Sequence, residues 1–290
     1  MRYRKILVIA NPASRGGKSR EEIPRIKEFF ESKGIATELY ETRKMADAIR
    51  KVKKDKSRFD CIIAAGGDGT INEVINGLAG SKIPFGVIPL GTENVLAKGL
   101  NIPLNTMKAC EFILSKKPTM IDLGKAKNRY FILMTGVGFD AYVASKIDPF
   151  FKKFLGSTAY ALKAIESLFI YEPSILKVTI DGKKKTEGYF VIIGNTKYYA
   201  STLKLTPHAD FMDGYLDVCV LKSRDVFSMI RYLLASSTLD ISKLNDVDYF
   251  KAKKVYISSR EKVLVHTDCE LIGSTPVRIT ICPMALKLIF

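Results

Sequence analysis

Short apolar runs alternate with amphipathic segments from Lys5 to Leu100, and this alternation constrains the fold more than any other feature. The runs "KILVIA", "DCIIAAG" and "FGVIPLG" suit buried strands, whereas "IPRIKEFFESKG", "ADAIRKVKK" and "TINEVINGLAG" suit helices. Strands that alternate with helices form βαβ units, whose parallel strands are covered by the helices. We therefore predict a Rossmann-like α/β domain over residues 1–123, which residues 284–290 are candidates to complete.

Beyond Gly124 the pattern changes to short strands joined by turns, as in "RYFILMT", "ILKVTI", "GYFVIIGN", "YLDVCVLK" and "VRITIC". Asp181-Gly182 lies between two such runs and predicts a hairpin turn. Helical patterns interrupt the strands over residues 157–171 and 224–236. Because 290 residues exceed the usual size of one domain, we predict a second domain over residues 124–283, an antiparallel β-sandwich.

The chain carries 46 Lys and Arg against 30 Asp and Glu, a formal net charge of +16. Such an excess favours anionic partners: nucleic acid, a phosphorylated substrate or an acidic membrane surface. No segment approaches the ~20 apolar residues of a membrane span, so we expect any membrane contact to be peripheral. The five cysteines are far apart and form no C-x-x-C pair, which favours reduced thiols and the cytoplasm.

Two glycine-containing turns lead from predicted strands into predicted helices. The first, "AAGGDGTINEVING", lets its backbone approach a ligand closely, and Thr70 with Glu73 predicts a capping box at a helix start, where an anion is favoured. The second, "PLGTENVLAKGL", places Gly91 and Thr92 before another helix, although a plain helix cap explains Thr92 alone equally well. Both turns should converge at the carboxyl edge of the parallel sheet, where such sheets bind ligands.

A third turn, "PASRGGKS", follows the first predicted strand and nearly matches the P-loop pattern G-x-x-x-x-G-K-[ST]. Pro12 stands where that pattern has its first glycine, and proline has a fixed φ and no N–H. We therefore favour a strand-exit turn near a nucleotide, with Asn11 and Ser14 as contacts. A basic surface loop is the alternative.

Several motifs occur together in one order: "GGDGTINEV", "PLGTEN", "GVGFDA", "ADFMDGYLDV" and the late "DCE". In this combination the chain resembles the diacylglycerol kinase catalytic-domain family, which includes sphingosine kinases, ceramide kinases and bacterial soluble lipid kinases. The "GGDGT" motif alone is shared with NAD kinases and phosphofructokinases. The resemblance covers essentially the whole chain and implies an active site in the cleft between the two domains, with ATP as co-substrate and Mg²⁺ as cofactor.

The resemblance also implies roles for individual residues. Asp68 would organise Mg²⁺ or the reacting hydroxyl, Asp122 would join the active centre from the domain junction, and Glu270 would be the general base. A structural Mg²⁺ would be held by Asp213, with Asp210 and Tyr215 contributing backbone carbonyls. The implied nucleotide contacts are Asn11, Ser14, Gly66, Gly67, Gly69, Thr70, Thr92 and Asn94.

One departure from the family pattern concerns Cys269, which replaces a glycine in the usual Asp-Gly-Glu and whose position can require a backbone conformation that other residues disfavour. The two histidines, His208 and His266, lack metal-ligand spacing and are expected to be structural. The segment from Asp148 to Pro173 mixes aromatic residues with lysines. Its apolar face is a candidate to lie on an anionic bilayer or cover a lipid cleft, and a helix packed on the sandwich is the alternative.

Taken together, the residues favour an ATP-dependent lipid kinase of lipid metabolism. We expect it to be cytoplasmic and peripherally associated with the inner face of the membrane, with a lipid substrate and no nucleic-acid partner. The alternatives are an NAD kinase-like phosphotransferase on a soluble substrate and a non-catalytic nucleotide- or lipid-binding protein of the same fold. A diacylglycerol-like or a sphingoid-like acceptor, ATP or GTP, and a monomer or a homodimer all stay open.

Overall fold

The computed structural model describes residues 3–146, 166–167, 170–198 and 203–290. The chain divides into two compact units, Met1–Ile121 with Met284–Phe290, and Asp122–Pro283. We call them unit 1 and unit 2. The division falls inside strand β5 (Pro118–Ala126), and the last strand, β16 (Val277–Ile289), contributes residues to both units.

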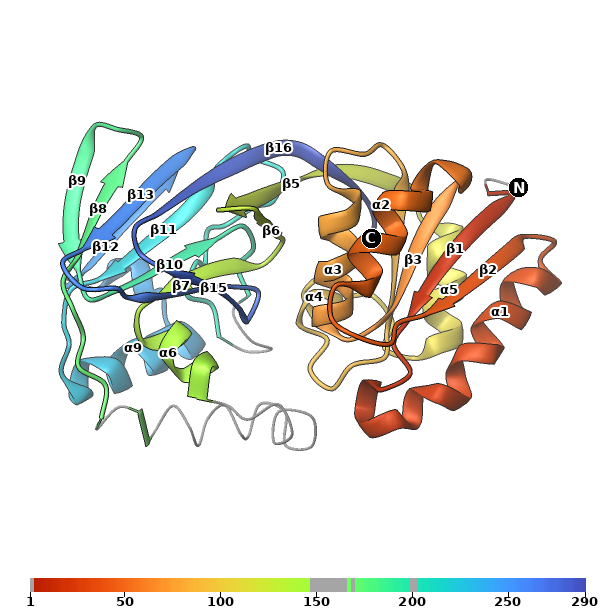
Figure 1. Ribbon diagram of the computed structural model, residues 1–290. Helices are drawn as coiled ribbons and strands as arrows, with labels where there is room; N and C mark the ends of the chain where they lie inside the picture. The colour runs from red at the N-terminus through yellow and green to blue at the C-terminus, as the bar shows by residue number, and fades with distance from the viewer. Residues whose placement is uncertain (1–2, 147–165, 168–169, 199–202) are drawn as a thin grey trace. The chain divides into compact units, whose positions relative to one another are not determined.

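Unit 1 contains the parallel sheet that the alternating pattern predicts. Its strands lie in the order β2-β1-β3-β4-β16, and Leu288 of β16 pairs with Phe85 in parallel. Figure 1 shows α1 and α5 on one face of this sheet and α2 and α3 on the other. The element bounds are β1 Lys5–Ala10, α1 Glu22–Ser32, β2 Ala36–Glu41, α2 Asp47–Asp55, β3 Cys61–Gly66, α3 Asp68–Leu78, β4 Pro84–Pro89, α4 Val95–Gly99 and α5 Thr106–Ser115.

Alternation along β1 explains why helices cover both faces. Ile6, Val8 and Ala10 belong to a buried cluster with residues of α1 and α5, whereas Leu7 and Ile9 are equally buried on the opposite face. Because successive side chains of a strand point to opposite faces, a strand that is buried at every position needs cover on both sides. The continuous apolar runs of the sequence therefore specify this three-layer arrangement.

The predicted capping box of Thr70 with Glu73 is wrong. Helix α3 starts at Asp68 with Gly67 as its N-cap residue, so Thr70 already lies inside the helix. The Glu73 carboxylate instead accepts the N–H groups of Ala46 (2.8 Å) and Ala48 (3.1 Å) at the start of α2. The acidic residue caps a neighbouring helix rather than its own, which sequence spacing alone does not reveal.

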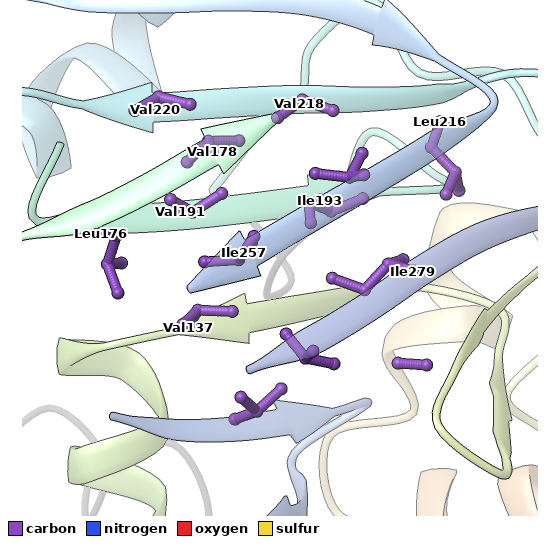
Figure 2. Close-up of a cluster of buried hydrophobic side chains, with 14 of the residues drawn as sticks. Val137, Leu176, Val178, Val191, Ile193, Leu216, Val218, Val220, Ile257 and Ile279 are labelled. Atoms are coloured by element: carbon purple, nitrogen blue, oxygen red, sulfur yellow. The ribbon is translucent and has the colours of Figure 1, made fainter. Parts of the chain in front are cut away.

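Unit 2 is the predicted antiparallel β-sandwich. One sheet has the order β12-β11-β10-β7-β14-β15, and the other contains β16, β13, β8 and β9, with β5 pairing to β16 and β6. Valine, leucine and isoleucine side chains from both sheets form its core (Figure 2). The bounds are β6 Arg129–Phe131, β7 Met134–Val137, β8 Leu176–Ile180, β9 Lys184–Gly188, β10 Phe190–Gly194, β11 Leu216–Leu221, β12 Val247–Ala252, β13 Lys254–Ser259, β14 Leu264–Thr267 and β15 Glu270–Ser274.

The predicted hairpin at Asp181-Gly182 is confirmed, since both residues have positive φ and the Lys183 N–H donates to the Ile180 carbonyl. It leads into the lysine-rich strand β9, which the apolar runs of the sequence did not include; the predicted run "GYFVIIGN" instead contains β10. Lysines are typical of an edge strand such as β9, where they discourage pairing with other chains.

Of the two helical patterns predicted in unit 2, the second is confirmed as α9 (Val226–Thr238). The first, over residues 157–171, lies almost wholly outside the described residues, as does most of the segment from Asp148 to Pro173. A shorter helix, α6 (Phe139–Lys146), follows β7. Among the described residues, no helix is long and apolar enough to span a bilayer.

Replacing Glu73 with Ala should destabilise unit 1 by about 1–2 kcal/mol, because the change removes the acceptor of two N–H groups at the start of α2. Hydrogen exchange should accelerate at Ala46 and Ala48, and the melting temperature should fall. Glu73→Gln keeps one side-chain oxygen and should lose less. Faster exchange confined to the first turn of α3 would contradict this assignment and restore the capping box.

Candidate active site

The two glycine turns of unit 1 meet at the carboxyl ends of β3 and β4, as the sequence predicts. The Leu90 N–H donates to the Gly66 carbonyl at 2.9 Å, which holds the turns side by side. A Cβ atom built on Gly91 would lie 2.4 Å from the Gly67 Cα, and one built on Gly67 would lie 3.2 Å from the Gly91 Cα. The backbones touch directly, so neither position has room for a side chain directed at the other.

Asn94 closes the second turn. Its side-chain oxygen accepts the Gly91 N–H and its amide donates to the Gly91 carbonyl, both at 2.8 Å. Asn94 has a φ of +51° and directly precedes α4, so it is the N-cap residue of that helix. Thr92 is exposed and lies outside α4, which rules out the helix-cap interpretation of Thr92.

Asp68 connects the first turn to the start of α4 by hydrogen bonds. Its carboxylate accepts the N–H groups of Val95 (3.2 Å) and Leu96 (3.3 Å), which open that helix. Burial raises the pKa of the Asp68 carboxyl, while the two N–H groups act in the opposite direction. Gly67, the N-cap residue of α3, contributes no side-chain acceptor, and the first turn of a helix favours an anion.

The turn after β1 reaches both glycine turns. The Asn11 side-chain amide donates to the Thr70 hydroxyl at 3.3 Å, and the Ser14 N–H donates to the Asn11 carbonyl at 3.2 Å. Sequence reasoning missed Arg15, whose Nε donates to the Gly91 carbonyl at 3.0 Å. The segment Ser14–Glu21 forms 3-10 turns with left-handed residues, and α1 starts only at Glu22, so a P-loop geometry is absent from this turn.

In unit 2, Asp122 and the turn from Asp210 to Tyr215 form one local structure. The buried Asp122 carboxylate accepts the Gly214 N–H at 2.7 Å, and the Asp122 N–H donates to the Phe211 carbonyl at 2.7 Å. Asp213 accepts the Tyr215 N–H at 2.9 Å. Asp122, predicted to join the active centre, therefore lies beside the turn that is predicted to bind magnesium.

The residues of this turn fit a magnesium ion, with a lysine as competitor. The Asp213 carboxylate and the carbonyls of Asp210 and Tyr215 are oxygen ligands of the kind Mg²⁺ takes. Lys251 pairs with Asp213 and lies 3.7 Å from the buried Asp217, one of whose oxygens has no hydrogen-bond partner. Burial disfavours the charged lysine, but these carboxylates raise the pKa of Lys251.

A cation at Asp213 would therefore replace the ammonium group of Lys251. Among the described residues there is no cluster of three or more His, Cys, Asp or Glu side chains that could hold a metal. A magnesium ion in this part of the chain would depend on carbonyl and water ligands beside the Asp213 carboxylate.

The "DCE" residues form a two-residue hairpin between β14 and β15. Asp268 and Cys269 have φ values of +45° and +63°, as the central residues of a type I′ turn require. The expectation that Cys269 occupies a conformation favoured by glycine is confirmed. The Asp268 carboxylate accepts the N–H groups of Ile132, Leu133 and Met134, each at 3.0 Å, and Glu270 pairs with Arg129.

The predicted residues thus fall into two groups and one separate residue. The turns of unit 1 bring together Asn11, Ser14, Gly66, Gly67, Asp68, Gly69, Thr70, Thr92 and Asn94. The turn of unit 2 brings together Asp122, Asp210, Asp213 and Tyr215, and Glu270 lies on a separate hairpin of the same unit.

Comparisons with known proteins match two family models to successive parts of the chain. A model of the diacylglycerol kinase catalytic domain matches residues 5–126, and a model of the YegS C-terminal NAD kinase beta sandwich-like domain matches residues 134–290. A diacylglycerol kinase from Staphylococcus aureus (strain bovine RF122 / ET3-1) is 32% identical over 273 residues, which cover 93% of this chain and 87% of the relative. The chain belongs to the diacylglycerol kinase family.

Two solved structures similar to this chain support the same family assignment. A diacylglycerol kinase from Bacillus anthracis str. Sterne is 26% identical, with a TM-score of 0.79 and coverage of 100% of this chain and 98% of that one. A second structure from the same strain is 28% identical, with a TM-score of 0.85 and coverage of 100% and 96%. The family's kinase fold therefore extends over both units.

Replacing Gly91 with Ala should weaken nucleotide binding by this diacylglycerol kinase-family protein more than replacing Gly67. The added methyl group at Gly91 collides with the Gly67 backbone, and such overpacking costs about 1–3 kcal/mol. Titration with a fluorescent ATP analogue and a melting curve should show both effects for Gly91→Ala and smaller ones for Gly67→Ala. Unchanged nucleotide affinity in Gly91→Ala would remove the two turns from the nucleotide site.

Magnesium should raise the melting temperature of the wild-type protein, because a ligand that binds only the folded state adds about 2.7 kcal/mol at one hundred times its Kd. Asp213→Asn should abolish this rise, and Lys251→Met should enlarge it by removing the competing ammonium group. Asp248→Asn is the matched control, since it breaks a different Lys–Asp pair of the unit, the one with Lys222. A rise that persists in Asp213→Asn would place the metal elsewhere.

Proposed function

We propose that this chain is an ATP-dependent lipid kinase that transfers the γ-phosphoryl group of Mg-ATP to a lipid hydroxyl. The observation that carries the proposal is the direct contact of Gly67 with Gly91 at the N-terminus of α3, in a chain of the diacylglycerol kinase family. Bare backbone at a helix N-terminus suits a phosphate chain.

The nucleotide's phosphates would lie against these turns. Gly67 and Gly69 would offer backbone N–H groups, Thr70 and Asn11 would offer polar side chains, and Arg15 adds a positive charge beside Gly91. Phosphoryl transfer depends chiefly on alignment of the two reactants and on neutralisation of phosphate charge. Magnesium, when bound, would contribute to that neutralisation.

Glu270 would accept the proton of the lipid hydroxyl as the hydroxyl oxygen attacks the γ-phosphorus and ADP leaves. The ion pair with Arg129 fixes the orientation of the Glu270 carboxylate, and both side chains are partly exposed. A general base needs to lie within hydrogen-bond reach of the proton that it removes. Asp68 and Asp122 are proposed to organise the charges around the transferred group.

The names of the relatives favour a diacylglycerol-like acceptor over a sphingoid-like one. A net charge of +16 suits peripheral binding to an anionic leaflet, where each basic group near the surface contributes roughly 1 kcal/mol. The second family model includes NAD kinase in its description of the sandwich, so a soluble acceptor such as a dinucleotide is the alternative to test.

The proposal is tested by incubating the full chain with Mg²⁺, γ-labelled ATP and vesicles of a total lipid extract, followed by mass identification of the labelled product. Label in a lipid, dependent on the vesicles, supports the proposal and names the acceptor. Label transferred to NAD would favour the NAD kinase-like alternative. ATP binding without transfer to any acceptor would favour a non-catalytic protein of the same fold.

Glu270→Gln should lower the turnover number by ~10²–10⁴-fold while ATP affinity stays unchanged, because glutamine keeps the shape of the side chain but accepts no proton. Steady-state kinetics and nucleotide titration measure the two quantities. Cys269→Gly is the companion variant: it places glycine at a left-handed position, where other residues cost roughly 1–2 kcal/mol, and should preserve or raise both activity and stability. Near-normal turnover in Glu270→Gln would transfer the role of base to Asp68.

A further inference from the structure

The "GVGFDA" motif contributes nothing to the site as described so far, yet it surrounds a buried histidine. Gly136 on β7 pairs with His266 on β14 in the antiparallel register, and Asp140 lies in the first turn of α6. His266 is only 1% exposed. A histidine buried in this way needs partners for both ring nitrogens.

Both ring nitrogens of His266 have a partner. Nε2 contacts the Asp140 carboxylate, and Nδ1 lies 3.2 Å from the backbone nitrogen of Cys269. A backbone N–H can only donate, so Nδ1 is the acceptor and the ring carries its proton on Nε2, which donates to Asp140. The imidazole therefore connects a fixed carboxylate to a single amide of the "DCE" turn.

Gly136 provides the space for this connection. A Cβ atom built on Gly136 would lie 2.4 Å from His266 Nε2 and 2.5 Å from the Asp140 carboxylate oxygen. Gly136 thus leaves space for the imidazole of His266, and Asp140 of the same motif binds it. The space that the imidazole and the carboxylate occupy explains why a glycine is found at position 136.

The amide that His266 binds belongs to the turn that carries Glu270. Cys269 is the second left-handed residue of the hairpin, and Glu270 is the next residue. On the other side of the same turn, Asp268 accepts three N–H groups of the segment from Ile132 to Met134. Two side-chain acceptors therefore set the orientation of this short hairpin, and His266 Nδ1 is the one adjacent to Glu270.

We propose that His266, oriented by Asp140, is a positioning residue that fixes the hairpin and thereby the Glu270 carboxylate. This inference rests on the proposed function, because Glu270 is the general base only if the chain is a lipid kinase. The displacement of a reacting group by about 1 Å can cost 10²-fold in rate, so one hydrogen bond to the turn is enough to affect turnover.

Two substitutions separate the two contacts of the ring. Asparagine can present a side-chain oxygen near the position of Nδ1, and glutamine can present an N–H near the position of Nε2. His266→Gln should lose the contact to Cys269 and lower kcat by roughly 10- to 100-fold, with the KM for Mg-ATP unchanged. His266→Asn should keep the contact to Cys269 and lose the contact to Asp140, and its kcat should be higher than that of His266→Gln.

The hairpin itself can be observed without substrate. With ¹⁵N-labelled cysteine, the protein's five cysteines give five amide signals, and Cys269→Ser identifies the one from the turn. The Cys269 amide should exchange with solvent faster in His266→Gln than in His266→Asn. Gly136→Ala places a methyl group against His266 Nε2 and the Asp140 carboxylate, so it should displace the imidazole and also accelerate exchange at the Cys269 amide.

Val178→Ala is the matched control for stability. It removes buried methyl groups from the same core, on a strand that pairs with none of β7, β14 and β15. It should lower the melting temperature while leaving kcat and Cys269 exchange close to wild type. Equal losses of kcat in His266→Asn and His266→Gln, or losses that follow the melting temperature alone, would overturn the positioning role.

Failure of this inference is distinguishable from failure of the proposed function. If the wild-type protein phosphorylates no lipid, the proposed function and the catalytic consequence of His266 both fail. Amide exchange at Cys269 then still decides whether His266 holds the turn. If the wild type is active and exchange at Cys269 is equal in both variants, only the positioning role is wrong.

Discussion

The contact between the backbones of Gly67 and Gly91 is the constraint on which the rest of unit 1 depends. Because neither residue has a Cβ, the turns after β3 and β4 approach closely enough for Asp68 to reach the N–H groups that open α4. Arg15 joins the same junction from the turn after β1. Three turns from adjacent strands thus contact one another beside a helix N-terminus that favours an anion.

The sequence pattern predicted the architecture because, in both units, the order and type of the strands can be read from short stretches of sequence. Continuous apolar runs in β1 and β3 specify strands buried on both faces, and in unit 2 short strands such as β8 and β13 alternate buried and more exposed positions. The sequence pattern did not predict β9, because this exposed edge strand has the composition of a loop. It also did not predict that Glu73 binds the start of another helix. Spacing within one segment carries no information about a carboxylate that binds elsewhere.

The same limit separates the predictable from the unpredictable part of the site. Asn11, Gly67, Thr70 and Asn94 follow strands or open helices, so topology alone brings them together. The pairing of Arg129 with Glu270 and the position of Arg15 depend on long-range packing. His266 looked like an ordinary structural histidine because its two partners, Asp140 and Cys269, are visible only after β7 and β14 have paired.

Several carboxylates in this chain hold loops by accepting backbone N–H groups. Asp68, Asp122 and Asp268 each accept backbone N–H groups from a distant turn. Elsewhere in unit 1, backbone N–H groups such as that of Arg43 hold the pKa of Asp47 below its ordinary value. Charge-assisted bonds of this kind are stronger than neutral ones and fix geometry. A carboxylate that accepts backbone N–H groups keeps its negative charge, so the net charge of +16 follows from 46 Lys and Arg against 30 Asp and Glu, and this excess is available to attract an anionic partner.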